Sequence, residues 1–155
     1  MSAPVVQHYF AYGSNMDPER VRLRGLPFHS VTAAQLRGYS LLFDKVAQNH
    51  EREAHANLEP RLHGVVEGVL YELAEPGAIL VMDRYEQTPI NYSREVVSVA
   101  TVEGKRLAWT YFANPARRQA GCAPGRVYLQ HLLAGAPFLS EAYLAFLCSH
   151  RIADD

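Results

Sequence analysis

Strand-forming residues dominate this sequence, and most of the expected strands follow one another without a helix between them. Runs rich in β-branched and aromatic residues predict strands over 5–12, 36–43, 63–73, 93–102 and 106–113, with a short strand near 56–58 in a polar loop over 44–60. Glu103-Gly104-Lys105 predicts a hairpin between the last two. Because few segments form strand–helix–strand units, the pattern favours a mixed, curved sheet or small barrel with helices outside.

Short helices are predicted at four places. Asp17-Pro18-Glu19 supplies an N-cap, a first-position proline and a first-turn acid for a helix that ends near Gly25. Glu75-Pro76-Gly77 opens a second helix, which ends near Tyr85 because Pro89 follows. The last two helices carry apolar residues at helical spacing: one contains Tyr128, Leu129, Leu132 and Leu133 and ends at Gly135, and the other is capped by Ser140 and contains Tyr143, Leu144, Phe146 and Leu147.

The composition is that of an ordinary globular protein. With 155 residues, 48% of them apolar and 20% charged, the chain predicts one domain over residues 1–155. Its net charge of −1 argues against nucleic-acid or anionic-membrane binding. No apolar run approaches the ~18 residues that span a bilayer, and the first residues lack a secretory-signal pattern. We therefore expect a soluble, cytoplasmic protein.

Several familiar catalytic devices are missing from the sequence. His50 and His55 are five residues apart, which places their rings about 140° apart on a helix and on opposite faces of a strand. Cys122 and Cys148 have neither metal-type spacing nor the pattern of a disulfide framework, and nothing near Cys122 marks a nucleophile. The sequence also lacks the serine-hydrolase elbow, the P-loop and the dinucleotide-binding glycine pattern. It therefore predicts no metal, no cofactor and no covalent triad.

The first candidate site is the turn Tyr12-Gly13-Ser14-Asn15, between a strand and the start of a helix. Backbone N–H groups at such a junction lack partners and lie beside the positive end of a helix dipole. Gly13 allows a ligand close to the backbone, and Ser14 and Asn15 add side-chain donors. A carboxylate or a developing oxyanion suits this chemistry. The alternative is an ordinary turn.

The second candidate is Glu86, directly after the helix that ends near Tyr85. The negative end of the helix dipole disfavours the charged carboxylate, and exclusion of water by Tyr85 and Tyr92 acts in the same direction. Both effects raise the pKa of Glu86 towards the range of a general base. The alternative is a solvated glutamate in a turn.

Taken together, these segments resemble the γ-glutamylcyclotransferase-like superfamily, with its plant AIG2-like and γ-glutamylamine cyclotransferase branches. The resemblance runs nearly from end to end. Phe10–Met16 matches the opening motif of the family and is the most specific element. The other matching segments are Ala56–Pro60, Gly64–Tyr71, Met82–Glu86, the strand that begins at Tyr92, and Pro124–Tyr128.

The resemblance implies an α+β fold, a small mixed β-barrel with peripheral helices. It assigns the acid/base role to Glu86 and places Tyr128 in the substrate pocket, which Tyr12 and Tyr92 also line. Two positions depart from the family pattern. Gln87 stands where a glycine usually follows the catalytic glutamate, and Gly125 replaces the serine of Pro-Ser. Both lie at the pocket, so the departures concern the choice of substrate more than the reaction.

The reaction implied is release of 5-oxoproline from a γ-glutamyl amine or γ-glutamyl amino acid, without a cofactor. The α-amine of the substrate attacks its own γ-carbonyl, and Glu86 moves the protons. Backbone N–H groups of Gly13, Ser14 and Asn15 hold either the α-carboxylate or the oxyanion. Two alternatives remain: a non-catalytic module that binds a small carboxylate or a protein, and a hydrolase in which Glu86 activates water. The leaving amine and the oligomeric state are left open.

Overall fold

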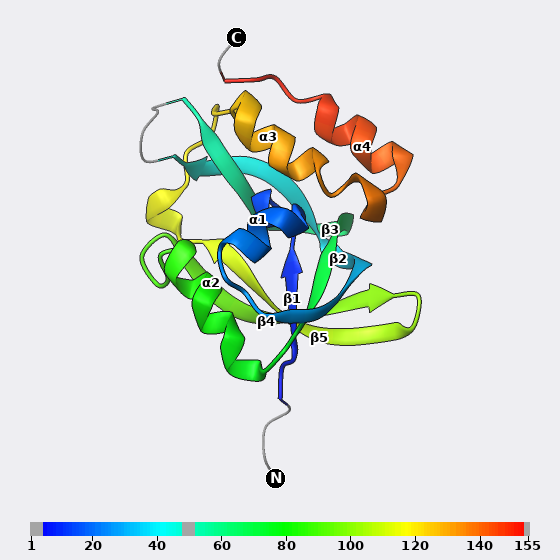
Figure 1. Ribbon diagram of the computed structural model, residues 1–155. Coiled ribbons are helices and arrows are strands. Elements are labelled where there is room, and N and C mark those ends of the chain that lie inside the picture. Colours follow the sequence, from blue (N-terminus) through cyan, green and yellow to red (C-terminus); the bar gives the residue numbers. More distant parts are fainter. Residues whose placement is uncertain (1–4, 48–51, 154–155) are drawn as a thin grey trace.

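The computed structural model describes residues 5–47 and 52–153 and contains a closed barrel of five strands. The order around the barrel is β1-β3-β2-β4-β5 (Figure 1). β1 pairs in parallel with β5, and all other neighbours are antiparallel, which confirms the expected mixed barrel. The strands are β1 (His8–Ala11), β2 (Phe28–Val46), β3 (Ala54–Leu73), β4 (Tyr92–Thr101) and β5 (Gly104–Ala113).

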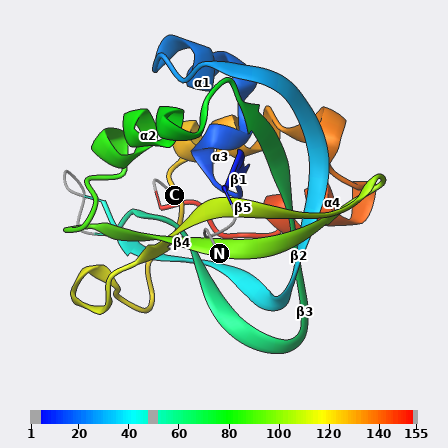
Figure 2. The ribbon, with the colours of Figure 1, turned by 90° about the horizontal axis from the view of Figure 1, so that it is seen from below.

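Two strands are much longer than the sequence predicts. β2 covers 19 residues and β3 covers 20, and they pair from Phe28↔Leu73 to Val46↔Ala54 with three register shifts. Figure 2 shows both strands curving strongly as they form part of the barrel wall. The prediction of a loop over 44–60 is therefore wrong, because most of these residues belong to β2 and β3. The polar residues of this segment pair through their backbones, and the buried Asn57 amide donates to the buried Asp44 carboxylate at 3.0 Å, so local polarity does not prevent a strand.

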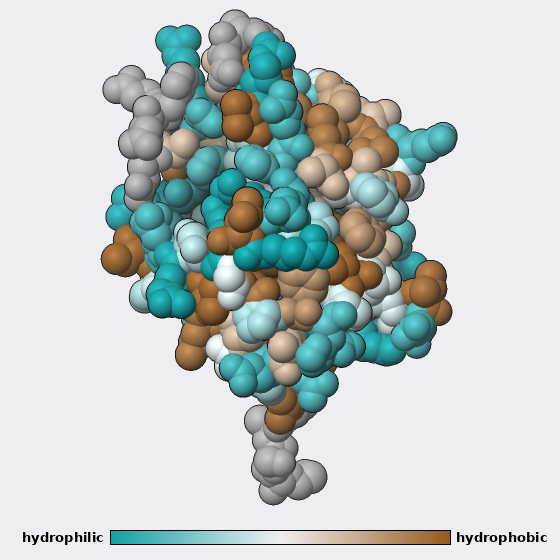
Figure 3. All heavy atoms as spheres, viewed as in Figure 1, coloured by the Kyte–Doolittle hydropathy of each residue, from teal (hydrophilic) through white to brown (hydrophobic). Residues whose placement is uncertain are grey.

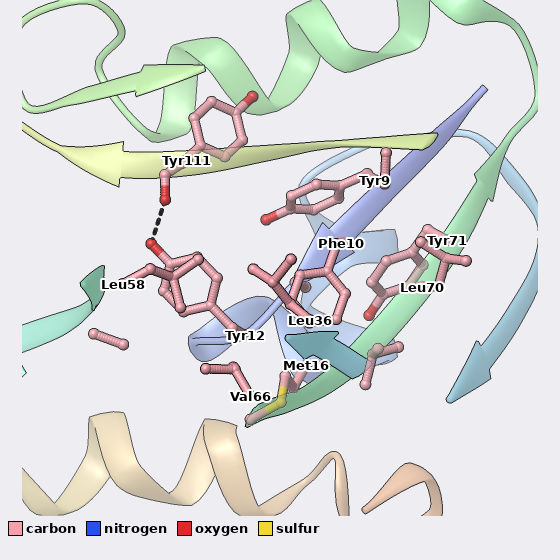
Figure 4. Packing of buried hydrophobic residues seen from close by; sticks show 14 of the residues in the cluster. Tyr9, Phe10, Tyr12, Met16, Leu36, Leu58, Val66, Leu70, Tyr71 and Tyr111 are labelled. Atoms are coloured by element: carbon pink, nitrogen blue, oxygen red, sulfur yellow. Dashed lines mark hydrogen bonds between the residues drawn. The ribbon is translucent and has the colours of Figure 1, made fainter. Parts of the chain in front are cut away.

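The barrel closes where β1 lies against β3 and β5. Gly68 permits this contact, because a Cβ atom there would lie 2.5 Å from the Ala11 carbonyl oxygen and 2.7 Å from the Phe10 ring. On the other side, the Thr110 hydroxyl donates to the Phe10 carbonyl oxygen at 2.9 Å. Phe10 and its buried neighbours, among them Met16, Leu36, Val66, Leu70 and Tyr71, fill the barrel (Figure 4).

Four α-helices lie around the barrel within the described residues, and the two side-chain caps that the sequence predicts, Asp17 and Ser140, are confirmed. The Asp17 carboxylate accepts from the backbone N–H groups of Glu19 and Arg20, and the Ser140 hydroxyl accepts from Tyr143 N. Polar and apolar side chains alternate over the face in Figure 3, as on ordinary protein surfaces. The helices are α1 (Pro18–Leu23), α2 (Ile79–Tyr85), α3 (Arg126–Leu133) and α4 (Glu141–Cys148).

Short 3-10 turns precede or follow several of these helices. The turn η1 (Ser14–Met16) lies between β1 and α1, and η2 (Pro76–Ala78) leads into α2. Two more turns are η3 (Pro115–Arg117) and η4 (Ala136–Phe138). No helix among residues 5–47 and 52–153 combines the length and apolar character needed to cross a bilayer.

Candidate active site

A pocket of about 330 Å³ lies where β1, α1, the end of β2, the start of β3, α2 and α3 meet. Its volume falls in the range of small-molecule sites. The fold brings every candidate residue from the sequence to its wall, although these residues span most of the chain. They are Tyr12, Gly13, Ser14, Asn15, Glu86, Tyr92 and Tyr128.

Glu86 occupies the C-cap position of α2, as the sequence predicts, and its side chain is half-buried at the pocket. Burial raises the pKa of its carboxyl above the ordinary value. The cations Arg24, Lys45 and Arg20 oppose this shift and keep it from growing larger. A carboxylate that is poised in this way can accept a proton and return it.

Asn15 holds the carboxylate of Glu86 in place. Its side-chain nitrogen donates to Glu86 Oε1 at 3.2 Å and to the Tyr9 hydroxyl at 2.9 Å. Its side-chain oxygen accepts from Arg24 at 3.1 Å, and its carbonyl oxygen accepts from the Tyr71 hydroxyl at 2.6 Å. The sequence predicts Asn15 as a donor to a ligand, and the structure instead shows a donor to Glu86 and Tyr9.

Gly13 is needed because the chain passes close to α3. A Cβ atom at this position would lie 3.0 Å from the Tyr128 hydroxyl and 3.5 Å from Ala56 Cβ. The N–H groups of Ser14 and Asn15 begin the 3-10 turn η1, so they have no partner within it. The Ser14 N–H group already interacts with the Tyr128 hydroxyl, so a guest in the pocket would share or replace that contact. The N-terminus of α1 lies further along the chain and is already capped by Asp17, so its dipole contributes less than expected.

The pocket tyrosines are tied to backbone groups. Tyr12 donates from its hydroxyl to the Tyr111 carbonyl oxygen (Figure 4). Tyr92 donates to the Ala56 carbonyl oxygen at 2.9 Å, whereas the Tyr128 hydroxyl accepts from Ala56 N at 2.8 Å. Burial raises the pKa of Tyr12, Tyr92 and Tyr128 above the ordinary tyrosine value, so all three stay protonated at neutral pH.

A family comparison matches this geometry. The sequence profile described as "Gamma-glutamyl cyclotransferase, AIG2-like" matches residues 9–130, which is more than half of the chain. The chain belongs to the AIG2-like γ-glutamyl cyclotransferase family. The matched segment includes every pocket residue that the sequence predicts, from Tyr12 to Tyr128.

Solved structures agree with this membership. A protein described as a γ-glutamyl cyclotransferase is 25% identical and superimposes with a TM-score of 0.81 over 96% of this chain and 89% of its own. An uncharacterized human protein, 24% identical, has the same fold with a TM-score of 0.83 over 98% and 92%. A yeast γ-glutamyl cyclotransferase specific to glutathione, 14% identical, superimposes with a TM-score of 0.58 over 90% and 93%. No match was found among curated proteins. The family match and the first of these structures indicate an enzyme of the γ-glutamyl cyclotransferase type, and the other two share its fold.

The pocket also contains three cations that the sequence predictions do not single out. Arg20 lies in α1, and Arg24 is the C-cap residue of the same helix, about one turn further along. Their i, i+4 spacing, close after the candidate turn, is a signal that the sequence contains. Lys45 lies at the end of β2, only 4% exposed, with its Nζ 5.7 Å from the Tyr92 ring centroid. Nothing local predicts Lys45, since its segment is expected to be a loop.

A histidine stacks on one of the predicted tyrosines. The centroids of the His55 and Tyr128 rings lie 4.4 Å apart, and the interplanar angle is 21°. Burial and the nearby cations lower the pKa of His55 to about 4, so the ring is neutral at physiological pH. His50, whose spacing from His55 argues against a shared metal ion, lies outside the described residues. Among those described, no three His, Cys, Asp or Glu side chains gather to hold a metal ion.

The two departures from the family pattern now have a structural setting. Gln87 adopts a positive φ of 50°, the left-handed conformation that follows many helices and favours glycine. Its side chain accepts from Asn91 Nδ2 at 2.7 Å, which ties down the turn. Gly125 is the N-cap of α3, and its surroundings leave no room for a side chain unless Glu53 moves.

Proposed function

We propose that this chain releases 5-oxoproline from a γ-glutamyl amine or γ-glutamyl amino acid, with Glu86 as general acid/base. The observation that carries the proposal is the half-buried Glu86 carboxylate, whose pKa is raised by burial in a pocket that also contains cations. A general base works best when its pKa is close to the operating pH. A module that only bound a carboxylate would gain nothing from this negative group.

The reaction needs no nucleophile from the protein. Glu86 removes a proton from the substrate's α-ammonium group, and the freed amine attacks the γ-carbonyl carbon. A C–N bond forms and closes the five-membered ring, the bond to the leaving amine breaks, and the protonated Glu86 returns its proton to that amine. The ring nitrogen then gives up its second proton to Glu86, which passes it on to the released amine, so that the products are a neutral lactam group and an alkylammonium ion. Because both reacting groups belong to one molecule, binding in a folded conformation supplies much of the acceleration.

The charges of the pocket suggest how the substrate lies. The α-amine and α-carboxylate share one carbon atom, so an amine at Glu86 brings the carboxylate close to the cations that act on Glu86. We assign the α-carboxylate to this set, which comprises Arg20, Arg24 and Lys45. We assign the oxygen of the γ-carbonyl, where negative charge develops, to the N–H groups of Ser14 and Asn15, the first of which exchanges its contact with the Tyr128 hydroxyl for the substrate.

Arg20 and Tyr128 are held in positions that suit these roles. Arg20 lies 3.4 Å from His131 Nε2, and the other ring nitrogen of His131 lies 3.1 Å from the Asp17 carboxylate. Tyr128 accepts a hydrogen bond from Ala56 N, which leaves its own proton for the substrate. An arginine orients a carboxylate through fixed, parallel donors, so a braced side chain costs less entropy on binding.

The test follows oxygen in water enriched in ¹⁸O. With γ-glutamylbutylamine as substrate, we expect unlabelled 5-oxoproline and one equivalent of butylamine, because water never attacks the γ-carbonyl. Labelled glutamate as the first product would instead establish the hydrolase. Substrate binding without any product would establish the binding module. Glu86→Gln should lower kcat by at least ~10²-fold, the usual cost of losing general acid–base catalysis.

A further inference from the structure

A histidine behind the pocket wall contacts one of the pocket cations. His131 lies in the last turn of α3 and is half-buried. Its Nε2 atom lies 3.4 Å from Arg20 Nη1, and its Nδ1 atom lies 3.1 Å from Asp17 Oδ2. Arg20 lines the pocket, whereas His131 does not. His131 is therefore placed to act on the site through Arg20, without touching a ligand there.

The two partners of His131 determine which ring nitrogen carries the hydrogen. An ionised carboxylate only accepts hydrogen bonds, and an arginine only donates them. Nδ1 must therefore carry a hydrogen for Asp17, and Nε2 must offer its lone pair to Arg20. The neutral ring with its hydrogen on Nδ1 is the one form that satisfies both partners.

Asp17 is itself held in place as the N-cap of α1. Its Oδ1 atom accepts from the backbone N–H groups of Glu19 at 3.1 Å and of Arg20 at 3.4 Å, which leaves Oδ2 for His131. The helix that carries Arg20 thus also fixes the carboxylate that orients the ring. Since Asp17 and His131 are both half-buried, solvent screens their contact less than it would on the surface.

The guanidinium group of Arg20 depends on His131. Its Nε atom is buried and has no hydrogen-bond partner among the described residues. Burial lowers the pKa of Arg20, and the positive charge of Arg24 lowers it further. Within the described part of the chain, the ring of His131 is the side-chain acceptor that contacts this guanidinium group. Loss of that acceptor would leave Arg20 without a side-chain hydrogen bond to hold it against the repulsion from Arg24.

The other titratable groups near α3 do not take over this role. Burial raises the pKa of Tyr128, one turn before His131, and of Tyr143 on the neighbouring α4, so both stay protonated. His55, which stacks on Tyr128, has a pKa lowered to about 4 and is neutral at physiological pH. The remaining charged or titratable residues of α3 and α4 are exposed, and they are Arg126, Glu141 and Cys148.

We propose that His131 is a positioning residue that makes binding of the substrate's α-carboxylate depend on pH. The neutral ring holds Arg20 at the pocket. A protonated ring carries a hydrogen on both nitrogens, so Nε2 no longer accepts from Arg20 and its positive charge repels the guanidinium group. This role rests on the proposed function, in which Arg20 contacts the α-carboxylate, and it adds regulation of that site by pH.

The experiment measures binding by calorimetry in the Glu86→Gln background, which removes turnover and the titration of Glu86. The ligands are γ-glutamylbutylamine and 4-amino-N-butylbutanamide, which lacks only the α-carboxylate. Histidine ordinarily changes charge between about pH 5 and 8, so the two conditions are about pH 5.5 and about pH 8. We expect the Kd of γ-glutamylbutylamine to be about tenfold larger at the lower pH, as for the loss of one charge-assisted hydrogen bond. The Kd of the second ligand should be nearly the same at both pH values.

Two substitutions separate the acceptor from the titration. His131→Gln supplies a neutral side chain whose oxygen can accept from Arg20 and does not titrate, so binding should stay tight at both pH values. His131→Leu removes the acceptor, so binding should be weak at both. The exposed His29 on β2 provides the matched control, and His29→Gln should keep the full pH dependence.

Nitrogen NMR of the ligand-free protein gives a measurement that needs no substrate. We expect the Arg20 Nε signal to shift with the same midpoint as the ring of His131, and an Arg20 signal that stays constant through that titration would overturn the coupling. A pH dependence of binding that survives His131→Gln would overturn it as well, and 5-oxoproline release by the wild type would still leave the cyclotransferase standing. Binding that follows His131, with no 5-oxoproline from the wild type, would refute the cyclotransferase and leave the role of His131.

Discussion

The side-chain amide of Asn15 lies 3.2 Å from Glu86 Oε1 and joins two parts of the chain that are 71 residues apart. The same amide accepts a hydrogen bond from Arg24, so one side chain links the candidate base to a neighbouring cation. Through this contact, the turn after β1 sets the orientation of a carboxylate at the end of α2. Asn15 is thus a positioning residue for Glu86.

Asn15→Ala should reduce kcat by about tenfold and lower the free energy of unfolding by about 1–3 kcal/mol, because buried partners lose their hydrogen bonds. The hydrogen bond from Asn15 lowers the pKa of Glu86. Its loss should therefore move the acid limb of the kcat/KM profile to higher pH. A purely structural role would reduce activity equally at every pH, and that result would remove Asn15 from the positioning of Glu86.

Glu86→Gln should stabilise the protein at neutral pH. The folded pKa of Glu86 lies above the unfolded value, so its contribution to stability is full below the unfolded pKa and is lost as pH rises through the folded one. Glutamine keeps the shape without this loss. Thermal unfolding should show a higher Tm for the variant at about pH 7.5 and nearly equal Tm values at about pH 3.5. Equal Tm values at both pH values would show that burial does not raise this pKa.

Lys45→Gln should move the acid limb of the kcat/KM profile to higher pH. The positive charge of Lys45 lowers the pKa of Glu86, so its removal lets burial raise that pKa further. The measurement is a pH profile with γ-glutamylbutylamine. Lys105 on the exposed hairpin serves as the control, since Lys105→Gln removes the same charge far from the pocket. An unchanged limb in the Lys45 variant would contradict the electrostatic coupling.

Activity should survive prolonged treatment with a chelator, and the purified protein should contain no stoichiometric metal. The reason is chemical: the proposed ring closure uses the substrate's own amine and one carboxylate, so no Lewis acid is required. Metal analysis and assays before and after dialysis against the chelator provide the measurement. Loss of activity that one divalent ion restores would overturn this expectation.

Gly68→Ala should lower the free energy of unfolding by about 1–3 kcal/mol, because the Cβ atom of the new alanine would clash with the Ala11 carbonyl oxygen and the Phe10 ring. Gly77→Ala is the matched control, since nothing lies within 4 Å of a Cβ there. Urea unfolding of both variants measures the difference. Equal midpoints would mean that the contact between β1 and β3 relaxes at little cost.

Local rules in the sequence determined the helix ends and the hairpin. Asp17 and Ser140 cap their helices as expected, and Glu86 follows α2 where Pro89 prevents its continuation. These features depend on hydrogen bonds and steric limits within a few residues, so neighbouring residues suffice to predict them. The motif resemblance also located the seven predicted pocket residues before any contact was known.

Tertiary structure alone decided the length of β2 and β3 and the electrostatics of the pocket. The residues expected in a loop over 44–60 are largely strand, because β2 and β3 satisfy each other's backbone groups there. That pairing delivers Lys45, Glu53 and His55 to the pocket. The raised pKa of Glu86 likewise depends on burial by elements from the whole chain and on the balance of three distant cations. Burial and register are properties of packed segments, and no local pattern in the sequence encodes them.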